Sequence, residues 1–171
     1  MGIDTVMYIT TYIHMHETDA LRPHGLVTLG SRLRRLGERL QGQTQDILNE
    51  IDPRMPAASL PLLAFLDGPE PRPIGDIAAA LGTAQPGVTR AVTRLSTLGL
   101  TATAPSPQDA RLRLVSLTPA GRTLLAEARA KAWPRTRAAV TDLCAPFGPE
   151  LLNMLDTIEA RLDAKPLKDR P

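Results

Sequence analysis

Residues 81–100, LGTAQPGVTRAVTRLSTLGL, combine an apolar stripe with a polar face that contains no acidic residue. Val88, Val92 and Leu95 recur at helical spacing, so we expect them to face the core. The opposite face then presents glutamine, threonine and arginine side chains. In the major groove of B-DNA, glutamine can pair with adenine and arginine with guanine, whereas threonine can reach a phosphate or a thymine methyl group. The pattern therefore predicts a helix whose partner is negatively charged.

A second basic group follows in a predicted β-hairpin. Residues 100–104 and 111–117 are β-branched or alternating, and PSPQDA between them is typical of a turn. Arg111 ends that turn and could enter a minor groove, Arg113 is expected on the same strand face, and Asp109 is placed to hold Arg111. The residues predicted to bind DNA are Thr83, Gln85, Pro86, Gly87, Thr89, Arg90, Thr93, Arg94, Arg111 and Arg113.

Upstream, the sequence predicts two short helices that position this surface. SLPLLAFLDG predicts one that Ser59 caps and Gly68 closes, and IGDIAAALG predicts a second that Gly82 closes. PEPRP between them is interpreted as a linker. The next helix either is capped by Thr83 or begins without a capping side chain, because Ala84 occupies its start. Two helices joined by a tight glycine-containing turn, followed at once by a hairpin, predict a winged helix.

Longer helices are expected on either side. Leucine and isoleucine recur at three- and four-residue spacing after Gly25, which predicts a long amphipathic helix with a coiled-coil-like seam. Thr118 and Pro119 begin a later helical region that Pro134 is expected to kink. We expect an extension of uncertain order at 1–24, a folded domain at 25–165 and a disordered tail at 166–171. Within the folded domain, the winged helix is expected at about 59–118 and the long helices at about 25–51 and 119–164.

The composition limits the fold class and excludes several functions. The 171 residues are 43% hydrophobic but only 3% aromatic, enough for one compact domain with an aliphatic core. The net charge of +2 permits nucleic-acid binding without requiring it. A single cysteine excludes an internal disulfide. No apolar run approaches the ~20 residues that span a bilayer, and no signal peptide is expected. These three observations together favour a cytoplasmic protein. No catalytic constellation stands at mechanistic spacing, so neither enzyme activity nor a cofactor is expected.

The hairpin and the helix after it carry a family resemblance. LGTAQPGVTRAVTRLSTLGL followed by DARLRLVSLTPAGRTLL resembles the MarR family of bacterial transcription regulators, whose recognition helix ends L-x-x-x-G-L before D-x-R and L-T-x-x-G. The positions that match are Asp109, Arg111, Leu117, Thr118 and Gly121. The resemblance covers roughly residues 25–165. LGSRLRRLGERL at 29–40 is similar to regulators that are sometimes fused to an acetyltransferase domain, which this chain is expected to lack.

The resemblance implies a mainly α fold with a small β-hairpin, a winged helix-turn-helix with N- and C-terminal dimerisation helices. It also implies a homodimer that binds a pseudo-palindromic operator in double-stranded DNA, usually a repressor that a small aromatic or anionic effector releases. Ala84 replaces a frequent serine and Ala110 a frequent second wing arginine, and both changes remove potential phosphate or groove contacts. The alternative is a winged helix that docks proteins and binds DNA weakly, without sequence preference.

Two polar groups allow both a functional and a structural interpretation. His14, His16, Glu17 and His24 could ligate a metal, but their spacing fits no metal motif, so no metal site is expected. Cys144 could be an oxidation sensor, although a buried structural thiol is favoured.

Two further groups have the same ambiguity. The long helix contains four arginines: Arg32, Arg34, Arg35 and Arg39. We expect them to form a solvent-exposed face or intersubunit ion pairs with Glu38 and its neighbours. A phosphate contact is the less favoured interpretation. Four apolar residues could line an effector pocket, although such residues more often belong to the core: Met55, Leu62, Phe65 and Trp133.

Overall fold

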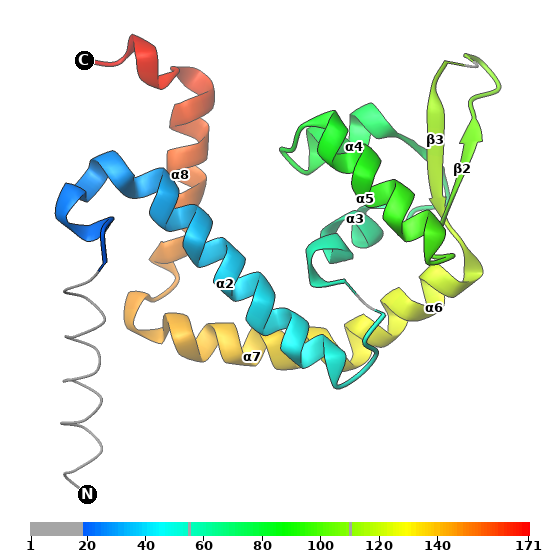
Figure 1. Ribbon diagram of the computed structural model, residues 1–171, viewed down its shortest axis with the longest axis horizontal. Coiled ribbons are helices and arrows are strands. Elements are labelled where there is room, and N and C mark those ends of the chain that lie inside the picture. Colours follow the sequence, from blue (N-terminus) through cyan, green and yellow to red (C-terminus); the bar gives the residue numbers. More distant parts are fainter. Residues whose placement is uncertain (1–18, 55, 110) are drawn as a thin grey trace, which may run out of the picture. The chain divides into compact units, whose positions relative to one another are not determined.

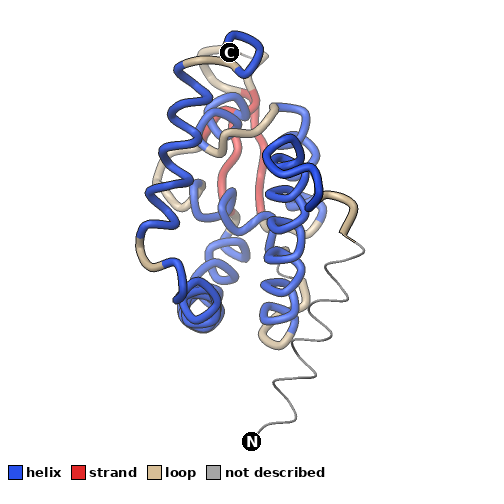
Figure 2. The backbone as a smooth tube through the Cα atoms, turned by 90° about the vertical axis from the view of Figure 1, so that its left-hand side faces the viewer, coloured by secondary structure: helices blue, strands red, loops and turns tan. Residues whose placement is uncertain are grey.

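The computed structural model describes residues 19–54, 56–109 and 111–171, and the chain divides into two compact units after Asp46. Helices dominate, with one small antiparallel sheet, which confirms the predicted fold class. Figure 1 labels the longer helices and the two strands of the hairpin, and Figure 2 distinguishes helices from strands by colour. The division differs from the single compact domain expected from length and composition.

The first unit contains a 3-10 helix, Arg22–Thr28, and most of the long helix α2, Leu29–Asn49. The helical pattern predicted a start at Gly25, but this glycine has φ 53° and ψ −127°, which an α-helix cannot include, so α2 begins later. The leucines of the predicted seam keep much of their surface exposed: Leu29 37%, Leu33 39% and Leu36 50%. Because the seam adds little to a buried core, this stretch forms a unit of its own.

The second unit is built around an aliphatic core. Its first helices are α3 (Leu60–Phe65), which follows a 3-10 turn at Ala57–Ser59, then α4 (Ile74–Ala80), α5 (Gln85–Thr97) and α6 (Pro119–Glu127). The largest fully buried side chains are Leu48, Leu63, Leu66, Ile77, Leu95, Leu125 and Val115. Each such side chain stabilises the fold by about 1.5–3 kcal/mol relative to exposure. The core therefore fixes how α3, α4, α5 and α6 pack.

The sheet has three strands in the order β1-β3-β2. β2 (Thr101–Pro105) and β3 (Arg113–Leu117) form the predicted hairpin, with Thr101 opposite Leu117. β1 (Arg72–Pro73) pairs with β3, so part of PEPRP is a strand and its interpretation as a linker is wrong there. A two-residue strand containing proline shows no alternating pattern and is confined to a sheet edge, which is why the sequence did not reveal it.

The ends of α3 differ from those predicted. Ser59 lies in the 3-10 turn with helical φ and ψ of −100° and −6°, whereas a capping residue is usually extended, and its side chain makes no capping hydrogen bond. The helix ends at Phe65, and Gly68 is not among the described glycines with positive φ. Neither Ser59 nor Gly68 therefore has its predicted role.

The helical region after the sheet is interrupted as Pro134 predicted. A π-helical turn, Ala128–Ala132, separates α6 from α7 (Trp133–Cys144), and Pro134 lies in the first turn of α7. Proline cannot donate the backbone hydrogen bond of a continuous helix, and a wider turn before it accommodates the missing bond.

A last helix, α8 (Glu150–Ala164), follows a 3-10 turn at Ala145–Phe147. The tail differs from the disorder expected, because residues Leu167–Asp169 form a 3-10 turn. The Arg170 guanidinium donates to the Lys165 carbonyl at 2.6 Å and also to the Arg161 carbonyl, which holds the tail on the end of α8. None of the described helices is long and apolar enough to cross a membrane.

Thr118 and Gly121 join α5, the sheet and α6. The Thr118 hydroxyl donates to the Gly99 carbonyl at 2.7 Å and accepts from the Gly121 N–H at 3.0 Å, so it caps α6 as predicted. The Thr118 N–H donates to the Leu100 carbonyl at 3.1 Å. A Cβ atom at position 121 would overlap that carbonyl oxygen, so only glycine allows α6 to approach this closely.

We predict that Gly121→Ala lowers the free energy of unfolding by about 2–3 kcal/mol, because backbone rather than a flexible side chain must move. Urea unfolding followed by circular dichroism measures the loss. Gly87→Ala is the matched control, since a Cβ atom there meets no atom within 4 Å beyond its chain neighbours and the backbone of its own helix. It should leave stability unchanged or raise it by up to about 1 kcal/mol. Equal stability of wild type and Gly121→Ala would contradict the proposed close approach.

Candidate nucleic-acid interface

The segment α4–turn–α5 forms the helix-turn-helix. Gly82 has φ +59° and ends α4, and the Thr83 N–H reaches back to the Ala78 carbonyl at 3.0 Å. This glycine-dependent helix end confirms the predicted closure at Gly82. α5 ends in the same way at Gly99, whose φ is +72°. Main-chain bonds therefore fix both turns. The first sets the direction in which α5 leaves α4, and the second sets the direction in which β2 leaves α5.

The outward face of α5 is the one predicted. Val88, Val92 and Leu95 are only 3%, 4% and 0% exposed. The exposed residues of the predicted surface on this helix and the turn before it are Thr83, Gln85, Pro86, Thr89, Arg90, Thr93 and Arg94, and Gly87 is half-buried. No acidic side chain interrupts the helix, so its arginines give this face a positive charge.

The beginning of α5 has no capping side chain. Ala84 is the N-cap residue in an extended conformation, so Thr83 does not cap the helix and the other predicted alternative is correct. The first N–H groups of a helix lack intrahelical partners and carry the positive end of its dipole. Pro86 has no N–H, and the Gly87 N–H donates to the Ala84 carbonyl at 2.9 Å. The uncapped start therefore suits an anion such as a phosphate through the Gln85 N–H and the positive end of the helix dipole.

The wing turn is closed by main-chain hydrogen bonds. The Ser106 N–H donates to the Leu112 carbonyl, and the Leu112 N–H donates to the Asp109 carbonyl, both at 2.9 Å. The Asp109 carboxylate accepts from the backbone N–H of Arg111 at 2.9 Å, so it holds the main chain and leaves the guanidinium exposed. β3 begins only at Arg113, so Arg111 lies outside the strand. The prediction that the two arginines share a strand face is therefore wrong. The bonds to Asp109 keep Arg111 in the turn.

A groove of about 510 Å³ runs between α5 and the hairpin. Its walls include Thr89, Thr93 and Ser96 from α5, Thr101 and Thr103 from β2, and Arg113 from β3. The Ser96 and Thr101 hydroxyls lie 3.0 Å apart and bond each other. The sequence patterns did not predict Ser96, Thr101 or Thr103 as site residues. The alternation of threonines in TAT at 101–103 was the available signal, because alternate residues of a strand share a face.

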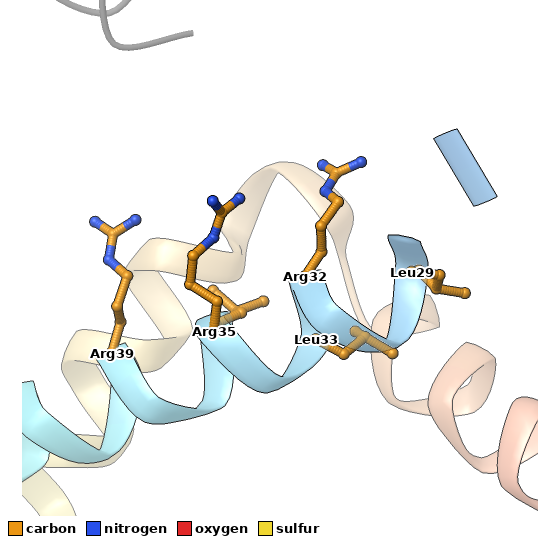
Figure 3. A pocket seen from close by; sticks show the side chains of 6 residues that line it. Leu29, Arg32, Leu33, Arg35 and Arg39 are labelled. Atoms are coloured by element: carbon orange, nitrogen blue, oxygen red, sulfur yellow. The ribbon is translucent and has the colours of Figure 1, made fainter. Parts of the chain in front are cut away.

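The arginine-rich part of α2 forms a separate surface in the first unit. Figure 3 shows Arg32, Arg35 and Arg39 extending in the same direction from the helix, next to Leu29 and Leu33. These residues line a shallow hollow of about 270 Å³. The surface is amphipathic, with charged and apolar groups side by side.

Two of the α2 arginines form ion pairs with acidic side chains. Arg34 pairs with Glu38 one turn later at 2.9 Å, so the expected partner is found within the same helix. The Arg35 guanidinium donates two hydrogen bonds to the Asp19 carboxylate at 3.0 and 2.8 Å. These bonds hold the pKa of Asp19 well below its ordinary value.

The residues considered for an effector pocket belong to the core or its margin where they are described. Leu62 is 3% exposed within the core cluster, and Phe65 and Trp133 are half-buried against it. The Arg129 guanidinium lies 5.4 Å from the centre of the Trp133 ring. Met55 lies outside the described residues.

The remaining polar candidates are placed as follows. Cys144 is half-buried at the end of α7 rather than fully buried as expected, and no other residue of α7 is buried either. His24 is exposed, and His14, His16 and Glu17 lie outside the described residues.

Residues 55–112, from the start of the winged helix to the wing turn, match the sequence model of the MarR family. No curated protein sequence gave a significant match. Among solved structures, a transcriptional repressor, CouR, bound to a 23-mer DNA duplex is 29% identical, with a TM-score of 0.64 over 77% of this chain and 92% of that chain. A probable transcriptional regulator from Pseudomonas aeruginosa is 27% identical, with a TM-score of 0.59 over 78% and 96%.

A mutant MarR from E. coli complexed with operator DNA is 17% identical, with a TM-score of 0.66 over 85% of this chain and 99% of that chain. At this identity the likeness concerns the fold alone. The winged-helix part of the chain, residues 55–112, is thus similar to the MarR family, and the solved structures share the fold of the chain.

Proposed function

We propose that this protein is a transcription regulator that binds a pseudo-palindromic site in double-stranded DNA as a homodimer. The observation that carries the proposal is the exposed, acid-free face of α5 beside a wing whose Arg111 and Arg113 are also exposed. The family match and the DNA-bound repressor at 29% identity support it. MarR proteins are regulators, so the proposal includes no catalytic activity.

Each part of the interface has a distinct role in the proposal. α5 enters the major groove, where Gln85 pairs with adenine and Arg90 and Arg94 contact guanine or the adjacent phosphates. The uncapped N-terminus of α5 faces a backbone phosphate. Arg111 enters the neighbouring minor groove, held at its backbone by Asp109.

The homodimer is supported by the apolar surface of α8. Leu155, Ile158 and Leu162 recur along one side of the helix and are 37%, 37% and 44% exposed. Contiguous exposed apolar residues of this kind mark interaction surfaces. Two copies related by a twofold axis would present two copies of α5 to half-sites about 10 base pairs apart.

We further propose that the protein acts as a repressor and that a small aromatic or anionic effector releases it from DNA. This part rests on the resemblance to MarR regulators. A bound effector would have to favour a state in which the two copies of α5 no longer match the half-sites.

We predict that Arg111→Ala weakens binding to all duplexes and lowers the slope of log affinity against log salt by about 1, because one phosphate-region charge is lost. Gln85→Ala should instead relax the sequence preference. Gel-shift titrations at several salt concentrations, with duplexes that the protein retains from a random pool, measure both effects. Arg137→Ala, an exposed arginine on α7 outside the interface, is the control and should bind as wild type does.

Unchanged binding by both Arg111→Ala and Gln85→Ala would contradict the assigned interface. Weak wild-type binding without any retained sequence would favour the alternative of a winged helix that docks proteins.

We predict that the wild-type protein sediments at twice the chain mass of 18.5 kDa and that Leu155→Glu combined with Ile158→Glu gives a monomer with weaker DNA binding. Buried unpaired carboxylates at an interface cost several kcal/mol. Ala160→Glu, which adds one carboxylate on the other side of α8, should remain dimeric. Analytical ultracentrifugation makes the comparison, with circular dichroism to verify folding. A monomeric wild type at micromolar concentration would contradict the dimer.

A further inference from the structure

A row of threonines runs along α5 with identical hydrogen bonding. The hydroxyls of Thr89, Thr93 and Thr97 each donate to the carbonyl four residues earlier, at 3.0, 2.9 and 3.1 Å. All three side chains are exposed. The bonds are therefore not a consequence of burial but a uniform feature of this side of the helix.

These bonds determine what the threonines can offer a ligand. A hydroxyl has one proton to donate, and in each of these side chains it is used within the helix. Threonine has a stiff χ1 angle, so fixing the hydroxyl also fixes the γ-methyl branch. What remains for a partner is a methyl group and an acceptor oxygen. The row is therefore poorly suited to donating hydrogen bonds to phosphate oxygens or to the acceptor atoms of a base.

Two of the three threonines line the groove between α5 and the hairpin. Thr89 and Thr93 share this groove with the apolar side chains of Ile74, Val92 and Ala102. Two further hydroxyls of the lining also bond within the protein, because Ser96 and Thr101 share a hydrogen bond and the Thr101 hydroxyl reaches the Val92 carbonyl at 3.5 Å. The groove lining as a whole, which also includes Thr103 and Arg113 of the hairpin, therefore presents more apolar than polar surface to an occupant.

We propose that Thr89 and Thr93 recognise thymine through its C5-methyl group, so that the bound half-site requires thymines at the positions facing them. Thymine is the base that carries a methyl group on its major-groove edge, and threonine methyl groups pack against it. The inference rests on the proposed DNA binding. Threonine in the major groove can contact either a phosphate or a thymine methyl group. For Thr89 and Thr93 we favour the methyl contact.

The test compares thymine with uracil, which lacks only the methyl group. A duplex retained from a random pool is synthesised again with deoxyuridine at one thymine position at a time. Uracil under Thr89 or Thr93 should weaken wild-type binding by about fourfold, the effect of one buried methyl group. Binding is measured by fluorescence anisotropy on the full chain.

Variants identify the protein partner of that methyl group. Thr93→Ser keeps the hydroxyl and removes the methyl, so its affinities for the thymine and uracil duplexes should become equal. Thr93→Val keeps a methyl in place and should retain the thymine-over-uracil ratio. The same pair of changes at Thr89 should act on a different base position. Thr97→Ser is the control, because Thr97 has the same hydrogen bond but does not belong to the groove lining described above.

Three results would overturn the inference: equal binding of thymine and uracil duplexes by wild type, a ratio kept by Thr93→Ser but lost by Thr93→Val, or a retained half-site without thymine. Each leaves the proposed function intact, because DNA is still bound. Failure to bind any duplex would instead contradict the proposed function itself.

Discussion

The approach of α6 to the backbone at Gly99 and Leu100 is the constraint on which the interface depends. At this corner α5 ends, β2 begins and α6 starts, and the Thr118 hydroxyl bonds on both sides of it. The glycine at 121 removes the one side chain that would hold the elements apart. The hairpin leaves directly from this corner, so its direction relative to α5 is set by main-chain contacts that tolerate little variation.

Hydrogen bonds within the protein also fix the side chains of the interface. Asp109 holds Arg111 through the main chain, which leaves the guanidinium available to a partner. The α5 threonines donate to their own helix, and Ser96 and Thr101 bond each other. Hydrogen bonding within the protein thus orients the groups that face outward, and the arginines supply the charge. This is a preorganised surface, in which few side chains must be ordered when a ligand binds.

The sequence predicted the features that depend on local chemistry. Helical spacing placed Val88, Val92 and Leu95 in the core, Gly82 closed its helix, and Thr118 capped the next one. It failed where a pattern was too short or where tertiary contacts decided. β1 has only two residues, Ser59 was drawn into a 3-10 turn, and the tail was ordered by Arg170 on the end of α8. The groove between α5 and the hairpin joins residues from separate elements, so no single stretch of sequence could reveal it.

The central claim is that α5 and the wing of two copies bind consecutive turns of duplex DNA. Selection of bound fragments from a random pool of duplexes, followed by sequencing, tests it most directly. The account predicts enrichment of two inverted half-sites whose centres lie about 10 base pairs apart. A pool that stays random after repeated rounds, or enrichment of a single unpaired half-site, would contradict it.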